Sequence, residues 1–266
     1  MQSISGSTRQ PGTARALAWP RFFLCLVVTA IGAALMWHGP IAQPADYHRF
    51  ADTRAWLGIP HAADVLSNLP FLLAGWIGLK AALRLPLSHP ARAAWGMFFC
   101  TVMLTMVGSS FYHWSPDNFG LGVDRLPIAW ACAWLALALL AERVAAGSGR
   151  PLVLLTAWLV ASASVWLWYA GEMAGNGDLR AYLFVQFLPV LLIPVVCALF
   201  RGGLLSATDW FGAIALYLIA KALELHDAQV FAILGAVSGH TLKHLVAAAA
   251  AFWLAWRLHH AAASMQ

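Results

Sequence analysis

The stretch Ser238-Gly239-His240-Thr241-Leu242-Lys243-His244 stands near the start of the last apolar segment of the chain. His240 and His244 are four residues apart, so in a helix they lie on one face, one turn apart. At that spacing two imidazoles can bind one metal ion. The residues around them are apolar enough to lie in a bilayer, where ionisable side chains are costly unless they have a partner or a function. The stretch therefore predicts a membrane helix that carries part of a metal site.

The composition predicts an integral membrane protein. Hydrophobic residues make up 61% of the 266 residues and charged residues only 10%, whereas soluble domains carry roughly 25% charged residues. The net charge of +5 does not indicate a nucleic-acid partner, because surplus Arg and Lys in a membrane protein usually mark its cytoplasmic loops. The four cysteines all lie in apolar segments without a closely spaced pair, which favours buried thiols over disulfides or metal ligands.

Eight apolar segments, each close to the roughly 20 residues that cross a bilayer, follow a polar stretch at residues 1–18 that we expect to be disordered. They cover residues 21–38, 62–83, 93–113, 122–143, 151–170, 180–200, 207–225 and 233–257. The first is long for a signal peptide and ends in a poor cleavage site, so we predict a retained transmembrane helix over 19–40. The short connections between the others predict an all-α, antiparallel bundle of seven transmembrane helices.

The distribution of basic residues predicts the orientation of the bundle. With the N-terminus inside, ten Arg and Lys residues lie at the inner ends of the segments and four at the outer ends. This asymmetry favours N- and C-termini in the cytoplasm. Ala and Arg greatly outnumber Lys and Asn, which is typical of a bacterial source, so we expect an inner-membrane protein whose outer ends face the periplasm.

Alternation of the spans brings many of the other polar residues to the outer side. These residues are His61, Asp64, Ser67, Asn68, His113, Asp117, Asp124, Glu224, His226, Asp227, His240 and His244. Ionisable residues concentrated at one depth of a bundle indicate a functional site. Lys221 and Glu224, three residues apart, predict a local ion pair, and Lys243 is expected to point away from the histidine face.

A third histidine completes a candidate ligand set. Ser109 and His113 are four residues apart at the end of the third segment, and Asp124 opens the next one. His113, His240 and His244 can supply three nitrogen ligands to Zn²⁺ and leave a fourth position for water, as in catalytic zinc sites. A metal there would lower the pKa of its water to near 7 and polarise a carbonyl. Asp124 is placed to accept the water's proton, and Ser109 to orient the water or donate to a developing oxyanion.

The motifs Gly108-Ser109-x-x-x-His113, Asp124-x-Leu126-Pro127 and His240-x-x-x-His244 resemble those of the alkaline ceramidases. These belong to a wider superfamily of heptahelical membrane hydrolases that includes the adiponectin-receptor-like proteins. The resemblance covers roughly residues 50–258 and leaves the first helix as an addition. It implies a seven-helix fold, zinc on the three histidines, and catalytic roles for Ser109 and Asp124.

The resemblance also implies a substrate. A lipid such as ceramide would enter sideways from the bilayer, and its amide bond would be hydrolysed to a fatty acid and a sphingoid-type amine. Eukaryotic members of the family carry several acids before their first family span that bind calcium. Here Asp46, Asp52 and Asp64 are present, with His61 where an acid would be expected, so calcium regulation is not expected. Nothing in the sequence indicates acyl length, head group or oligomeric state.

Two other functions stay open at this point. The protein could be a heptahelical receptor or lipid-binding protein with a structural zinc, although such a site has no use for Asp124 and Ser109 beside an open metal position. It could also be a proton-coupled transporter or a redox protein that uses the histidines as a relay or for haem. Two ligands on one helical face, however, cannot hold one haem from both sides.

Overall fold

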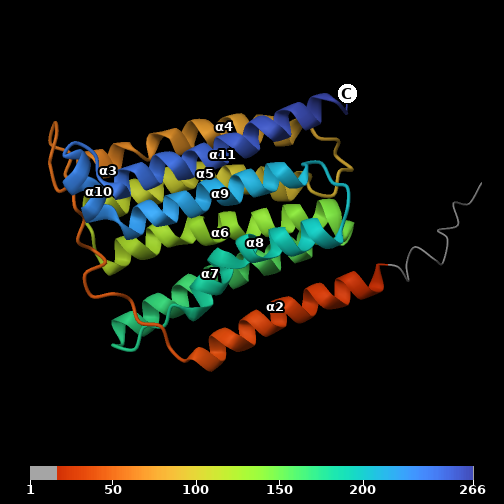
Figure 1. Ribbon diagram of the computed structural model, residues 1–266, viewed down its shortest axis with the longest axis horizontal. Helices are drawn as coiled ribbons and strands as arrows, with labels where there is room; N and C mark the ends of the chain where they lie inside the picture. The colour runs from red at the N-terminus through yellow and green to blue at the C-terminus, as the bar shows by residue number, and fades with distance from the viewer. Residues whose placement is uncertain (1–16, 266) are drawn as a thin grey trace, which may run out of the picture.

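The computed structural model describes residues 17–265, and their secondary structure is helical with no strand. The helices are α2 (Ala18–His38), α3 (Ala62–Leu66), α4 (Leu69–Arg84), α5 (Arg92–Trp114), α6 (Asn118–Arg143), the 3-10 helix η1 (Ala146–Gly149), α7 (Pro151–Met173), α8 (Arg180–Leu199), α9 (Ala207–Leu225), α10 (Asp227–Leu234) and α11 (Gly239–Ala263). Figure 1 shows them as a long bundle with α3 and α10 at one end. The predicted disordered tail at 1–18 lies outside the described residues except at its last two positions.

Each of the eight predicted spans contains a helix, but fewer than eight are long and apolar enough to cross a membrane. Six pass by length and composition, with α3 and α4 counted together, and a seventh passes if α10 and α11, which meet at 105°, form one span. Helix α9 is not among them because Asp209, Lys221 and Glu224 all lie in its 19 residues. Length and composition thus support six or seven of the eight predicted spans, and α9 packs against α8 and α11 within the bundle.

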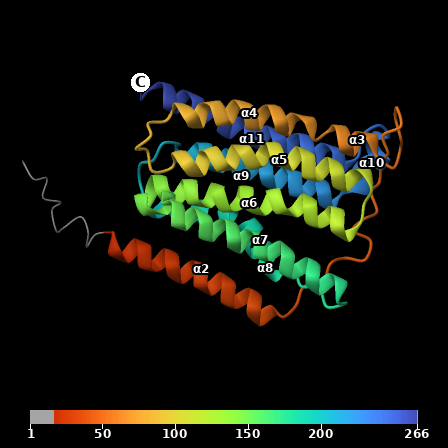
Figure 2. The same ribbon diagram turned by 180° about the vertical axis from the view of Figure 1, so that it is seen from behind.

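Six helices form a ring in the order α4, α5, α6, α8, α9 and α11, each packed against its neighbours. Helix α7 lies outside this ring against α6 and α8, and α2 lies against α8 at the edge of the bundle (Figures 1 and 2). The contact between α8 and α9 is the lightest in the ring. Leu24 is the one buried residue of α2, so this helix adds little to the core.

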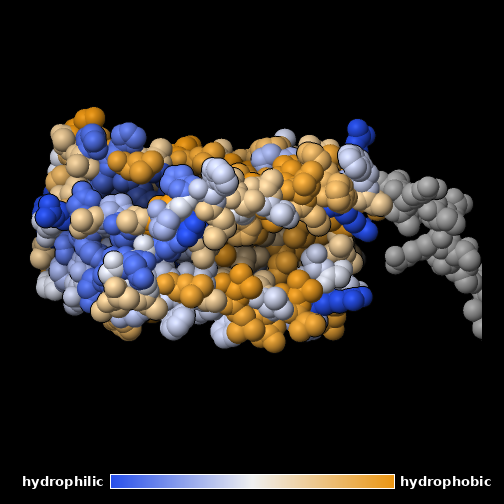
Figure 3. Space-filling view, turned by 90° about the horizontal axis from the view of Figure 1, so that it is seen from below, coloured by the Kyte–Doolittle hydropathy of each residue, from blue (hydrophilic) through white to orange (hydrophobic). Residues whose placement is uncertain are grey.

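The bundle is apolar on its outside. Leu72 and Trp76 of α4 and Leu155, Leu159 and Trp166 of α7 are all exposed, whereas the interior buries histidines, carboxylates and hydroxyls. In a soluble protein such an apolar surface would be unusual, but hydrocarbon is a good solvent for it. Figure 3 shows hydrophilic residues gathered at the end where α3 and α10 lie, and apolar residues along the middle of the molecule. These features are compatible with a multi-pass membrane protein.

Two glycines allow the close approaches that build the polar end. A Cβ atom on Gly108 would lie 2.8 Å from the carbonyl oxygen of Val123, so α5 and α6 could not meet there. A Cβ atom on Gly239 would lie 2.8 Å from Cα of Asp227, at the start of α10. Both distances are too short for any side chain. The glycines therefore let the end of α5 and the start of α11 reach the same part of the ring.

Candidate metal centre

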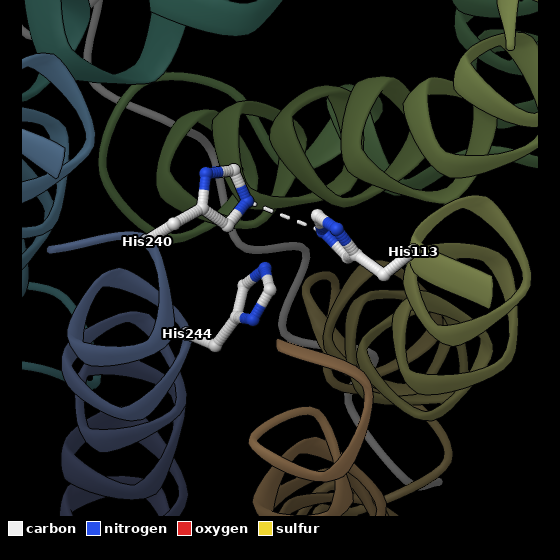
Figure 4. A group of neighbouring side chains, drawn as sticks. All are labelled: His113, His240 and His244. Atoms are coloured by element: carbon white, nitrogen blue, oxygen red, sulfur yellow. Dashed lines mark hydrogen bonds between the residues drawn. The ribbon is translucent and has the colours of Figure 1, made fainter. Parts of the chain in front are cut away.

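Three histidines from two helices point toward one another at the polar end of the ring (Figure 4). His113 lies in the last turn of α5, and His240 and His244 lie in the first turns of α11. One ring nitrogen of each lies within 4.8 Å of the others, and all three side chains are buried. The three residues predicted as ligands are thus brought together, in a cluster that could hold a metal ion.

The spacing inside the cluster suits a metal and excludes a haem. Nε2 of His113 and Nε2 of His240 are 3.2 Å apart. Two nitrogen ligands on a tetrahedral zinc, each about 2.05 Å from the ion, are about 3.3 Å apart. No porphyrin fits between two nitrogens at that distance. Two buried lone pairs that face each other are unfavourable unless a proton or a cation lies between them.

The hydrogen bonds of His244 leave its Nε2 available as a ligand atom. Its Nδ1 lies 2.8 Å from Oγ of Ser67, and the Ser67 hydroxyl donates to the carbonyl oxygen of Asp64 at 3.0 Å. Because the hydroxyl proton is engaged, Nδ1 of His244 carries the proton and donates it to Ser67. Metal-binding histidines commonly have such a partner on the second nitrogen, which fixes the tautomer.

The start of α11 is held by side chains that the predicted site does not include. Asp64 is fully buried, and its Oδ1 accepts a hydrogen bond from Oγ1 of Thr241 at 2.6 Å. Ser238 caps the helix by accepting from the backbone N–H of Thr241. The backbone N–H of His240 donates to Oδ1 of Asp227 at 2.7 Å. Sequence reasoning assigned Asp64 and Asp227 to the same side of the bundle as the histidines, but it did not predict their hydrogen bonds to Thr241 and His240.

The two predicted catalytic residues lie beside this cluster. Oγ of Ser109 is 3.5 Å from Nε2 of His244, one turn of α5 before His113. Asp124 is buried near the start of α6, and its Oδ1 has no hydrogen-bond partner. Ser109, Asp124 and His244 all line one cavity of about 200 Å³. The five predicted side chains therefore meet in one small region, which includes an unpaired carboxylate oxygen.

The loop at residues 39–61 covers the cluster at the end of the bundle where α3 and α10 lie (Figure 1). Phe50 is buried, and its ring meets the rings of His113 and His240 edge-on, with centroid distances of 4.6 and 4.7 Å. His48 in the same loop contacts the hydroxyl of Tyr112 at 2.9 Å. Sequence reasoning missed Phe50, because a single aromatic residue in a polar loop has no periodic pattern to mark it.

A second, apolar cavity of about 150 Å³ shares six lining residues with the first and lies toward the middle of the ring. The residues common to both cavities are Phe71, Thr105, Ile128, Gln186, Tyr217 and Ala247. Beyond them, residues such as Ile193, Ala213 and Leu254 make the lining of the second cavity almost wholly apolar. An apolar extension thus adjoins the polar chamber beside the histidines.

Charged groups from α9 and α11 line the polar chamber. Glu224 accepts hydrogen bonds from Lys221 and, at 2.9 Å, from Lys243. The predicted pair of Lys221 and Glu224 is confirmed, and Lys243 joins it. The hydroxyl of Tyr47, in the covering loop, lies 3.4 Å from Glu224. Burial and the nearby carboxylate raise the pKa of Tyr47 to about 12, so its phenol stays protonated.

The three acids considered for calcium do not gather at one site. Asp52 forms an ion pair with Arg54 at 2.6 Å, and this guanidinium lowers the pKa of the Asp52 carboxyl. Asp64 is engaged with Thr241 at the start of α11. Among residues 17–265 the three histidines are the one group of three or more such ligands that could hold a metal ion.

Fold and site together define an all-helical protein, compatible with a multi-pass membrane protein, that carries a buried three-histidine cluster able to hold a metal. The sequence matches no protein-family model and no curated protein. The resemblance to the alkaline ceramidases therefore rests on the motif residues alone.

Proposed function

We propose that the protein is a zinc-dependent intramembrane hydrolase of the alkaline-ceramidase type. Its reaction is hydrolysis of the amide bond of ceramide or a related lipid to a fatty acid and a sphingoid-type amine. The observation that carries the proposal is the unpaired carboxylate oxygen of Asp124 in the cavity that Ser109 and His244 also line. A zinc site that only supports the fold needs no such group beside it.

The roles of the residues follow from their positions. Zinc on His113, His240 and His244 would supply a Lewis acid that polarises the amide carbonyl and lowers the pKa of a coordinated water. Asp124 takes up the proton that the attacking water releases and returns it to the amide nitrogen as the C–N bond breaks. The Ser109 hydroxyl donates a hydrogen bond to the acyl oxygen as negative charge develops there. The water oxygen ends in the fatty acid and its proton in the amine.

The apolar extension of the cavity supports a substrate with an acyl chain. Its lining of apolar side chains suits a hydrocarbon tail, while the polar chamber suits the amide and the head group. The light contact between α8 and α9 is the place in the ring where a lipid could pass from the bilayer with least disruption. Both features favour entry of the substrate from the side.

We propose the orientation that the charge count predicts, in a bacterial inner membrane. The N- and C-termini then face the cytoplasm and the histidine cluster lies toward the periplasm. Of the four basic residues counted at the outer ends, Arg125 is buried inside the ring. Its burial increases the difference in exposed positive charge between the two sides, which supports this orientation.

The proposal is tested on purified protein by measuring zinc content and release of fatty acid from ceramide. We expect the wild type to hold about one zinc per chain and to release fatty acid, and His240→Ala to lose both. His260→Ala is the matched control, because His260 is exposed near the far end of the same helix, and it should keep both. A metal-free wild type that hydrolyses no lipid amide would contradict the proposal.

A further inference from the structure

Arg125 is a buried guanidinium without an acidic partner. It lies in α6 and is 4% exposed. Among residues 17–265, five side-chain ion pairs form and none involves Arg125. Even its chain neighbour Asp124 lies beyond ion-pair distance. A buried charge without a counter-charge is costly, so this position calls for an explanation.

One N–H donor of the Arg125 guanidinium has no hydrogen-bond partner, and neither has the amide nitrogen of its neighbour Gln43. Nη2 of Arg125 donates to Oε1 of Gln43 at 2.5 Å. Nη1 of Arg125 and Nε2 of Gln43 are both buried and have no hydrogen-bond partner. Two N–H donors on hydrogen-bonded neighbours are thus left without an acceptor. Buried donors are nearly always paired in folded proteins, so the pair indicates that an acceptor from outside the chain completes the site.

Aromatic rings hold the guanidinium in place. Its central carbon lies 4.1 Å from the ring centroid of Trp168, 4.8 Å from that of Tyr182 and 5.4 Å from that of Tyr47. Such contacts stabilise a cation through its faces. They supply no hydrogen-bond acceptor in the plane of the guanidinium, where its N–H groups point. The side chain is therefore fixed and charged, and its edge stays available.

Arg125 and Gln43 line the same cavity as Ser109, Asp124 and His244. The other two cations of this cavity, Lys221 and Lys243, are already paired with Glu224. Arg125 is consequently the one cation of the chamber, within the described residues, that has no carboxylate. A ligand whose amide lies at the histidines and whose tail lies in the apolar extension would leave its head group in this chamber.

We propose that Arg125 and Gln43 bind an anionic oxygen group, a carboxylate or a phosphate, on the amine side of the lipid amide. This assignment rests on the proposed hydrolase function and specifies its substrate class. The planar fork of Arg matches such groups with two parallel hydrogen bonds. The preferred substrates are then acidic lipid amides, such as N-acyl amino acids or phosphorylated N-acyl amines, rather than ceramide, whose head carries neutral hydroxyls.

Three lipids that share one acyl chain test the assignment. N-lauroylglycine carries a carboxylate, N-lauroyl-O-phosphoethanolamine a phosphate, and N-lauroylethanolamine a neutral hydroxyl. We expect the wild type to favour one or both acidic lipids in kcat/KM, mainly through KM. Arg125→Gln should reduce that preference, measured as the ratio of kcat/KM for an acidic lipid to kcat/KM for the neutral one, about 10- to 100-fold. Arg201→Gln is the control, because Arg201 is exposed between α8 and α9.

The two acidic lipids separate the possible sources of the anion. Preference for N-lauroylglycine identifies a carboxylate substrate, and preference for the phosphate lipid identifies a phosphorylated one. A wild type that favours the neutral lipid overturns the proposal, and so does a preference that Arg125→Gln leaves unchanged. Should the Gln variant not fold, Arg125→Lys keeps the charge but loses the fork, and a preference equal to that of the wild type would again count against the assignment.

Binding measured without turnover distinguishes failure of the anion site from failure of the proposed hydrolase function. Each lipid's effect on the melting temperature is measured with wild type and Arg125→Gln. If no lipid is hydrolysed, the hydrolase fails, but the anion site stands when N-lauroylglycine or the phosphate lipid stabilises the wild type more than N-lauroylethanolamine and the variant loses the difference. Equal stabilisation by all three lipids in both proteins overturns the anion site even if hydrolysis is found.

Discussion

The two ends of the helix ring bury different kinds of side chain. Toward the end formed by α3 and α10, Asp124 and Arg125 each have a buried polar atom without a partner. At the opposite end the ring of Trp95 stacks between those of Phe99 and Trp210, with centroid distances of 5.8 and 5.5 Å. The indole N–H of Trp95 donates to Glu142 at 2.6 Å. The unpaired groups of Asp124 and Arg125 line a cavity, whereas stacked rings fill the opposite end, although Nε1 of Trp210 there also has no partner. The two ends should therefore respond differently to mutation.

The largest effect on stability is expected from Trp95→Ala. Trp95 is fully buried, and removal of a buried tryptophan leaves a cavity that costs about 3–5 kcal/mol. The free energy of unfolding in detergent should fall by that amount, while the zinc content per folded chain stays at the wild-type value. Trp37→Ala, at an exposed tryptophan of α2, should leave both quantities unchanged. Loss of zinc from folded Trp95→Ala protein would show that the two ends are not independent.

Ser67→Ala is expected to have a smaller effect, and to lower zinc affinity rather than the stability of the fold. This change removes the hydrogen-bond partner of Nδ1 of His244, and loss of such an outer partner typically lowers metal affinity about 10- to 100-fold. Competition with a chelator measures the affinity. The melting temperature should change little, and Ser148→Ala in η1 serves as the control. Unchanged zinc affinity in Ser67→Ala would contradict the tautomer assigned to His244.

The smallest effect is expected from Asp178→Asn, in the connection before α8. Hydrogen bonds from Arg180 lower the pKa of the Asp178 carboxyl to about 2, below the value of about 3.9 in an unfolded chain. The pair therefore stabilises the fold above about pH 4, and this contribution is lost as the pH falls from about 4 to about 2. Because the pair is partly exposed, the effect should stay below about 1 kcal/mol.

Melting temperatures at pH 6 and pH 2.5 measure this contribution. The wild type should lose more stability between the two values than Asp178→Asn, whose side chain does not titrate. Zinc binding at pH 6 should be the same in both proteins, since Asp178 hydrogen-bonds to Arg180 and Ile41 and to none of the three histidines. If the melting temperature depends on pH identically in the two proteins, the ion pair of Asp178 and Arg180 does not contribute to stability.

The part of the site that the sequence predicted depends on helical periodicity. Ser109 and His113 on one helix, and His240 and His244 on another, share a face because they are four residues apart. Alternation of the spans then brings both pairs and Asp124 to one side. These inferences need successive helices to run back and forth along the bundle, as they do in Figure 1.

The rest of the site depends on packing that no local pattern encodes. Phe50 reaches the histidines from a loop without periodicity, and the rings around Arg125 come from that loop and from α7 and α8. Sequence reasoning counted Arg125 among the basic residues at the outer ends of the spans and gave no sign that it is buried. The ion pair of Lys221 and Glu224 was predicted, but its second cation, Lys243, comes from α11. In each case the residue is contacted by a side chain from a distant part of the sequence, which local patterns do not reveal.

Asp124→Asn tests the central claim, that the cluster is a hydrolytic site rather than a structural one. Wild type and variant are loaded with zinc to the same content, and release of fatty acid is measured on ceramide and on the three lauroyl amides. The account predicts that the variant keeps its zinc while the rate falls by about 10²- to 10⁴-fold, as expected for loss of a general acid–base group. Equal rates in the two proteins, or a zinc-loaded wild type that releases no fatty acid from any of these lipids, would contradict it.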